Sequence, residues 1–316
     1  MGIPRVLEQI DRAQQRHRAP GFVVGVLKKY SDDNGGNLTT LLAYASFVTI
    51  FPLLLLLLTA LSIVLADEPS WRERVLRSAF GELPLVGSQF ARNIHVLKRS
   101  SPFGLTIGLL GLAYGSTRMA QTGLYAMTQI WDIPRAATPK FAARLARSLE
   151  FLAVLGLGLL LTTVAAGFGT FGTHGVAAGI GAEILAVGVN IATYLGGFRV
   201  LTPKEVPTRS LVPGAVAGAV AWTVLQAVGG YVMGHDVRGS SQLYGTFGVV
   251  LGLLAWLGLA ALITMYAAEA NVVLSLRLWP RALLGPPRTA ADDRSAQLVA
   301  VREGVTAPPT PAARTG

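Results

Sequence analysis

Residues 41–65 read LLAYASFVTIFPLLLLLLTALSIVL and contain no charged side chain. A helix needs about 20 apolar residues to cross the roughly 30 Å hydrocarbon core of a bilayer, so this stretch is long enough to span a membrane. An earlier apolar run, 19–27, ends at Lys28 and Lys29 without the small-residue cleavage site of a signal peptide. We therefore expect 41–65 to be retained as the first transmembrane helix.

The composition of the whole chain agrees with a membrane location. Of 316 residues, 52% are hydrophobic and only 14% are charged, and the mean hydropathy is +0.50. Such values are typical of integral membrane proteins rather than soluble ones. The absence of cysteine excludes disulfides and thiolate chemistry, and none of the four histidines forms a metal-binding pair on a helix. We expect no metal and no cofactor.

Five further stretches are long and nearly free of charge. The second stretch is the shortest, and we expect its helix to continue toward Ile130. The fourth contains Glu183. Together these intervals predict an all-α integral membrane protein with six transmembrane helices in a compact bundle. The expected spans are 41–65, 102–118, 151–171, 176–198, 211–233 and 245–269.

The distribution of basic residues predicts the orientation. With six spans, 20 of the 27 Lys and Arg residues lie on the side that holds both termini. Because basic residues are favoured on the cytoplasmic side, both termini are predicted to be cytoplasmic. Anionic lipid head groups account for the basic excess, so no nucleic-acid partner is needed. We expect a cytoplasmic amphipathic arm at 1–37, the transmembrane domain at 38–279 and a disordered, proline-rich cytoplasmic tail at 280–316.

Residues 67–101, between the first two spans, form the one sizeable external segment. Large apolar residues such as Trp71 and Phe80 alternate there with arginines. This pattern predicts an amphipathic external helical segment at the membrane surface. Either it packs as a cap on the ends of the spans, or it acts as a lid.

Glycines at helical spacing predict where the helices pack. Lipid provides no hydrophobic drive for helix association, so helices approach closely at small residues. We expect a compact monomer in which the second and sixth helices are tightly packed; a homodimer through one of these faces is the alternative. The glycines with helix-packing roles are Gly104, Gly108, Gly111 and Gly115 in the second span, Gly214 and Gly218 in the fifth, and Gly245, Gly248 and Gly252 in the sixth.

Ionisable groups at membrane depth are costly and therefore functional candidates. Glu183 shares a face of the fourth span with Asn190, and the pattern fits a proton or substrate site, a helix-to-helix hydrogen bond or a position near the outer surface. Arg118 and Glu269 are expected near the cytoplasmic face, in an ion pair or with their charges reaching toward water. Pro52 removes a backbone hydrogen bond in the first span and predicts a kink.

No catalytic constellation is present in the sequence. There is no GxSxG elbow, no phosphate-binding loop, no dinucleotide fingerprint and no carboxylate cluster suited to two metals. We therefore expect a transport or structural role and not an enzyme.

Several segments resemble the YihY/BrkB family of bacterial inner-membrane proteins. The first span has the family's pattern of Ala-Tyr, a few apolar residues and Phe-Pro, and the other matches occur in the same order and spacing. The resemblance implies a six-helix protein of the bacterial inner membrane, with links to the cell envelope. The family's legacy "ribonuclease BN" label is unsupported by the residues. The matching segments are Leu41–Pro52, Ile130–Pro134, Pro213–Ala215, Leu243–Gly248 and Ala268–Asn271.

The leading hypothesis is a protein that transports or flips a lipid or other amphiphilic envelope molecule between its helices, with membrane lipids as its partners. The alternative is a non-catalytic scaffold whose cytoplasmic arms recruit an envelope-assembly partner. An ion or small-solute transporter and a membrane-bound nuclease rank lower. The residues expected to line a substrate path are Tyr44, Pro52, Glu183, Asn190, Tyr244, Glu269 and Asn271.

Overall fold

The computed structural model describes residues 11–12, 14–64, 102–133, 141–171, 176–235, 237–283 and 287–305. Every regular element within these ranges is helical. The elements are α2 (Arg18–Asp32), α3 (Gly35–Val64), α6 (Pro102–Ile130), α7 (Phe141–Phe171), α8 (Val176–Leu201), η3 (Thr208–Leu211), α9 (Val212–His235), α10 (Val237–Leu276) and α11 (Ala290–Glu303).

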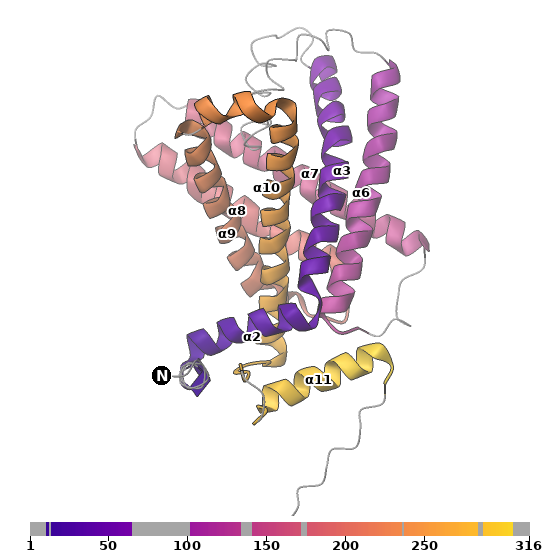
Figure 1. Cartoon of the computed structure of the whole chain (residues 1–316). Helices are drawn as coiled ribbons and strands as arrows, with labels where there is room; N and C mark the ends of the chain where they lie inside the picture. Colours follow the sequence, from indigo (N-terminus) through magenta and orange to yellow (C-terminus); the bar gives the residue numbers. More distant parts are fainter. Residues whose placement is uncertain are drawn as a thin grey trace, which may run out of the picture.

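Six long helices form a bundle, and two shorter helices, α2 and α11, lie across one end of it (Figure 1). Within the bundle, α3 packs most extensively against α6, α7 against α8, and α10 against both α9 and α3. The helix α2 contacts the C-terminal part of α10. We call this end of the bundle, where α2 and α11 lie, the α2–α11 end.

Four helices of the described residues contain segments long and apolar enough to cross a membrane: Leu145–Thr162, Glu183–Leu201, Thr208–Gly229 and Val250–Leu276. An all-helical membrane protein is therefore confirmed. The other two expected spans, 41–65 and 102–118, fall in α3 and α6, and six membrane crossings remain a prediction. The external segment 67–101 lies outside the described residues.

The surface and the core of the bundle are distributed as a lipid environment requires. Large apolar side chains such as Leu110, Ile184 and Val224 are more than half exposed. Such a surface would be unfavourable in water but suits contact with hydrocarbon. The buried core gathers toward the α2–α11 end, where Met127 and Val273 are 1% exposed or less.

Close approach at glycine occurs between specific helix pairs. A Cβ atom on Gly214 would lie 2.1 Å from the carbonyl oxygen of Ala267 on α10. A Cβ on Gly218 would lie 2.8 Å from the Tyr194 ring on α8, and one on Gly115 would lie 3.0 Å from Thr49 on α3. Only a residue without a side chain allows these distances.

The second and sixth expected spans are not tightly packed against each other: α6 packs mainly against α3, whereas α10 packs against α9 and α3, and α6 meets α10 over only a short stretch. Gly111, Gly248 and Gly252 are partly buried. The surroundings of Gly104, Gly108 and Gly245 lie outside the described part of the structure.

The prediction of a disordered tail is wrong for residues 290–303, which form α11. Thr289 and Asp292 cap its first turn reciprocally, and Gly304 ends it with a left-handed φ of 72°. Ala291, Ser295 and Arg302 on this helix are buried. Proline and alanine content indicated disorder, but the cap and these tertiary contacts outweigh composition. Residues 306–316 lie outside the described residues.

Candidate functional site

Five charged side chains from distant parts of the sequence meet at the α2–α11 end. We call Lys29, Asp33, Asp132, Glu269 and Arg302 the charge cluster. Each is 7% exposed or less. They come from α2, from the turn after α2, from the turn after α6, from α10 and from the last turn of α11.

Lys29 and Arg302 hold Asp33 and Asp132 from two sides. The Lys29 ammonium pairs with Asp33, lies 3.0 Å from Oδ2 of Asp132 and donates to the carbonyl oxygen of Ile130 at 3.0 Å. The Arg302 Nη1 lies 2.7 Å from Oδ1 of Asp33 and 3.0 Å from Oδ1 of Asp132. The two aspartates are therefore bridged by both cations.

Backbone geometry at the end of α6 sets the position of Asp132. Its φ of 50° is in the left-handed region, which aspartate tolerates better than most residues. Its N–H donates to the carbonyl of Gln129, and the Arg302 guanidinium donates to the same carbonyl at 3.1 Å. Arg302 thus contacts both the carboxylate and the backbone of this helix end.

Burial and neighbouring charge change the pKa values of this cluster. Burial alone would lower the pKa of Lys29, but the carboxylates of Glu269, Asp33 and Asp132 outweigh burial and raise it. Burial raises the pKa of Asp132, and Lys29 offsets only part of that effect. Lys29 is therefore firmly cationic, whereas Asp132 gains a proton more readily than an exposed aspartate.

Glu269 is the most isolated member of the cluster. Its carboxyl group is fully buried, and among the described residues neither of its oxygens has a hydrogen-bonding partner. Its largest electrostatic partner is Lys29, and the Asp33 carboxyl acts on it as well. The cluster therefore combines three acidic side chains with two basic ones.

A second set of ion pairs joins α2 to the segment that precedes α11. Arg281 contacts Asp32 at 2.6 Å and Asp292 at 2.9 Å. The Asp292 carboxylate also accepts the N–H groups of Ala282 and Thr289, both at 3.0 Å. These contacts fix Arg281 and the first turn of α11 against α2.

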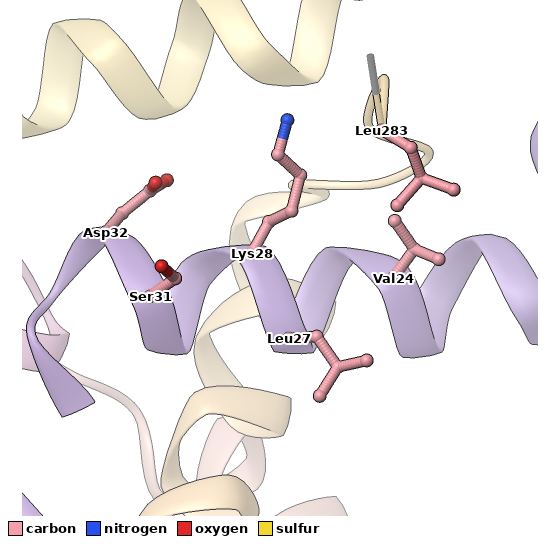
Figure 2. Close-up of a pocket in the computed structure, with 6 residues that line it drawn as sticks. All are labelled: Val24, Leu27, Lys28, Ser31, Asp32 and Leu283. Atoms are coloured by element: carbon pink, nitrogen blue, oxygen red, sulfur yellow. The ribbon is translucent and has the colours of Figure 1, made fainter. Parts of the chain in front are cut away.

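A shallow pocket lies beside these ion pairs (Figure 2). Val24, Lys28 and Leu283 point toward one another across it, while Leu27 points to the opposite side of α2. The Lys28 ammonium donates to the carbonyl of Ala282. The pocket is open, and its lining combines three apolar side chains with three polar ones. Its lining residues are Val24, Leu27, Lys28, Ser31, Asp32 and Leu283.

The structure separates the predicted site residues into different environments. Glu269 belongs to the charge cluster, and Asn271 accepts the N–H of Gly214 at 2.6 Å, so it caps the first turn of α9. Tyr44 is 64% exposed on α3, and Glu183 is exposed on α8 with Asn190 half-buried further along. These residues do not form one site.

Pro52 and Tyr244 are less fully described. The helix α3 continues through Pro52 to Val64 without interruption. The side chains of Pro52 and Tyr244 lie outside the described part of the structure, so the predicted kink and the role of Tyr244 remain predictions.

Arg118 is exposed in the interior of α6. It lies 12 residues before the end of this helix, which corresponds to about 18 Å of helical rise. Its Nε lies 3.2 Å from the Tyr114 hydroxyl, and its guanidinium lies 5.4 Å from the centre of the Tyr114 ring. It therefore lies within α6, five residues before Gly123, where α6 packs against Leu201 at the end of α8.

Sequence reasoning missed four of the five members of the charge cluster. Lys29 marked the end of an apolar run, Asp132 lay inside a family motif, and Arg302 was placed in a disordered tail. Lys29 and Asp33 have the i, i+4 spacing of a helical ion pair, but nothing in the sequence shows that this pair meets Asp132, Glu269 and Arg302. Within the described residues, no group of three or more His, Asp or Glu side chains is arranged to hold a metal ion.

Comparison with known proteins identifies the family. The family model described as virulence factor BrkB matches residues 26–291, which include Lys29, Asp33, Asp132 and Glu269 but not Arg302. A UPF0761 membrane protein of Psychrobacter sp. (strain PRwf-1) is 24% identical over 262 residues, covering 81% of this chain and 48% of the relative. The chain thus spans about half the length of that relative. No solved structure matches. With the family model matching most of an all-helical membrane chain, the protein belongs to the BrkB virulence factor family.

Proposed function

We propose that this membrane protein moves a lipid or other amphiphilic molecule across the bacterial inner membrane, without catalysing a chemical reaction. Both termini and the α2–α11 end face the cytoplasm in this proposal. The polar head of the molecule passes along the exposed face of α6 that carries Tyr114 and Arg118, while its apolar part stays in the surrounding hydrocarbon. Membrane lipids are the partners, and a homodimer remains an alternative to a monomer.

The observation that carries this proposal is the position of Arg118. In this proposal the exposed guanidinium, about 18 Å of helical rise from the last residue of α6 and five residues before the contact of Gly123 with Leu201, lies within the bilayer. The Tyr114 hydroxyl, one turn away, offers it a polar group at 3.2 Å. A charge in that position is costly unless it has a function. Guanidinium groups match the geometry of phosphate, which most phospholipid head groups carry.

A second polar side chain lies at a similar depth on the neighbouring helix. The helices α3 and α6 are antiparallel, because Lys29 binds both Asp33 before α3 and Asp132 after α6. Gly115 of α6 contacts Thr49 of α3, and this contact fixes a common level on the two helices. From that level, Tyr44 lies about 8 Å of helical rise toward the α2–α11 end, and Arg118 lies about 5 Å toward the same end. Tyr44 therefore supports a polar track at this level.

The test is lipid scrambling by the purified full-length protein in liposomes with fluorescent phospholipids. We expect the wild-type protein to accelerate scrambling and Arg118→Leu to slow it about tenfold or more, because a charge-assisted hydrogen bond contributes about 1.5–3 kcal/mol. Arg294→Leu, an exposed arginine on α11, is the matched control and should keep the wild-type rate. Glu183→Gln, measured in parallel, tests the intramembrane carboxyl.

Two outcomes would contradict the proposal. The first is an absence of scrambling by folded wild-type protein, with or without a proton gradient, and the second is scrambling by Arg118→Leu at the wild-type rate. The first result would favour the scaffold alternative, which the ordered layer of α2 and α11 supports. In that case removal of residues 287–316 would abolish the cellular function, while Glu183→Gln would leave it intact.

A further inference from the structure

The charge cluster has an unequal number of acidic and basic side chains in a buried site. Asp33, Asp132 and Glu269 oppose only Lys29 and Arg302, and all five are buried. If every group were ionised, one negative charge would remain uncompensated. An unpaired charge in a buried site costs several kcal/mol, so such a site tends to recruit a positive charge.

The contacts of the two cations show where that positive charge is missing. Lys29 and Arg302 both pair with Asp33 and Asp132, with nitrogen–oxygen distances of 3.0 Å or less. The buried carboxyl of Glu269 receives no hydrogen bond from any donor among the described residues. Its neighbour is the carboxyl of Asp33. Two carboxyl groups bond to each other only when one of them carries a proton.

The other titratable groups around the cluster do not remove this imbalance. The Tyr30 hydroxyl, next to Lys29 on α2, is within 2.9 Å of Thr39 Oγ1, and the Tyr30 ring stacks on Tyr266 of α10. Glu303 lies 3.9 Å from Arg302 but is largely exposed and adds a further negative charge. No other cation among the described residues forms an ion pair with the carboxylates of the cluster.

We propose that the charge cluster is a proton-binding site that holds one exchangeable proton among Glu269, Asp33 and Asp132. The proton comes from water and adds to a carboxylate oxygen, which neutralises the cluster, and its release restores the single negative charge. No other bond forms or breaks. In the proposed transport function, this proton is the coupling ion. That role rests on the proposed function, whereas proton binding by the cluster does not.

A proton fits this site better than a metal ion does. The Lys29 ammonium and the Arg302 guanidinium already occupy the space between the two aspartates, and both would repel a metal cation. A proton needs no coordination shell and only two oxygens at hydrogen-bonding distance. The raised pKa of Asp132, which burial causes, is in the direction that favours proton uptake.

Infrared difference spectroscopy on the full-length protein in lipid nanodiscs tests the site directly. At neutral pH we expect the carbonyl band of a protonated carboxyl group, with slow deuterium exchange because the site is buried. Glu269→Gln should remove the band. Asp132→Asn should also remove the band, because the cluster of this variant has two carboxylates and two cations and is neutral without a bound proton. Glu205→Gln, an exposed carboxyl in the turn after α8, is the control and should keep the band.

The two variants keep the test informative if one of them fails to fold. Absence of the band in folded wild-type protein, its persistence in Asp132→Asn or Glu269→Gln, or its loss on adding sodium at constant pH would overturn the proposal. A protein that scrambles lipid without showing the band would overturn the proton site alone. A band that behaves as expected in a protein without scrambling activity would support the proton site and contradict the transport function.

Discussion

At the residue scale, the contact between α9 and α10 depends on one glycine and one asparagine. The Asn271 side chain accepts the N–H of Gly214 at 2.6 Å and so satisfies a donor in the first turn of α9. The same approach brings the Gly214 backbone against the Ala267 carbonyl. Without a side chain at position 214, the capping bond and the close backbone contact exist together.

Gly214→Ala should therefore destabilise the protein markedly. The new Cβ would lie 2.1 Å from the Ala267 carbonyl oxygen and 2.5 Å from Nδ2 of Asn271, so the two helices must separate. We expect a loss of about 1–3 kcal/mol or more in the free energy of unfolding. The measurement is thermal unfolding in detergent.

Gly258→Ala on α10 is the matched control, because its Cβ would have no neighbour within 4 Å. Alanine is also the better helix former, so this control should be neutral or slightly stabilising. Equal melting temperatures for both variants would show that the packing between α9 and α10 is looser than the geometry indicates.

At the element scale, α11 is held to the bundle by charge. Arg302 joins its last turn to Asp33 and Asp132, and Asp292 joins its first turn to Arg281. The helix has only 14 residues and would be marginal in isolation. Its order therefore depends on these buried ion pairs.

Arg302→Ala should release α11. The substitution leaves Asp33 and Asp132 buried with one cation fewer, and breaking a buried pair costs about 3–5 kcal/mol. We expect faster hydrogen exchange throughout 290–303. Arg294→Ala, an exposed arginine on the same helix, should leave exchange unchanged. Undiminished protection in Arg302→Ala would mean that apolar contacts alone hold α11.

Acid should also weaken the attachment of α11. Burial raises the pKa of Asp292, but hydrogen bonds from the Ala282 and Thr289 amides and from Arg281 outweigh burial and hold the pKa well below its usual range. A carboxyl whose pKa is lower in the folded state stabilises that state above its unfolded pKa of about 3.9 and loses this effect as the pH falls.

Hydrogen exchange at Ala282 and in α11, corrected for intrinsic rates, should therefore accelerate progressively as the pH falls below about 4. In Asp292→Asn the protection should already be reduced at neutral pH, and its acid dependence should be smaller. The exposed Asp293→Asn serves as control and should behave as the wild type. An unchanged acid profile in Asp292→Asn would assign the acid sensitivity to other carboxyl groups.

The elements show which part of the fold could be read from the sequence. Charge-free intervals predicted the long helices well: 176–198 corresponds to α8 at Val176–Leu201, and 211–233 to α9 at Val212–His235. Apolar length is a local property, so one stretch of sequence suffices. The sequence did not predict α11, because this helix is stabilised by tertiary ion pairs that composition does not reveal.

At the scale of the whole molecule, the charge cluster depends on how the helices are arranged. More than 30 residues of sequence separate each of positions 29, 132, 269 and 302 from the next. These positions meet because α3 and α6 are antiparallel, so the start of α3 and the end of α6 lie together at the α2–α11 end. No periodicity connects them. Glu269 was singled out from its apolar surroundings, but its partners required the arrangement of the helices.

The same topology predicts how the protein lies in the membrane. The helix α8 begins at Val176 and ends at Leu201, and Glu205 lies in the turn after it. If Arg118 within α6 is not counted, the six-span prediction assigns 19 of the 27 basic residues to the side of the two termini, so the α2–α11 end should be cytoplasmic. The chain has no native cysteine, so a thiol reagent can label only the one cysteine that is introduced.

In intact cells, a membrane-impermeant maleimide should label His174→Cys and leave Glu205→Cys unlabelled. After the membrane is opened, both should react, which shows that each thiol is accessible. The orientation follows from an energetic bias of about 1 kcal/mol per basic residue near anionic lipid, and this bias is large when summed over so unequal a distribution. Labelling of Glu205→Cys from outside would show that the protein has the opposite orientation in the membrane. The charge cluster would then lie at the periplasmic end of the bundle and would exchange its proton with that side.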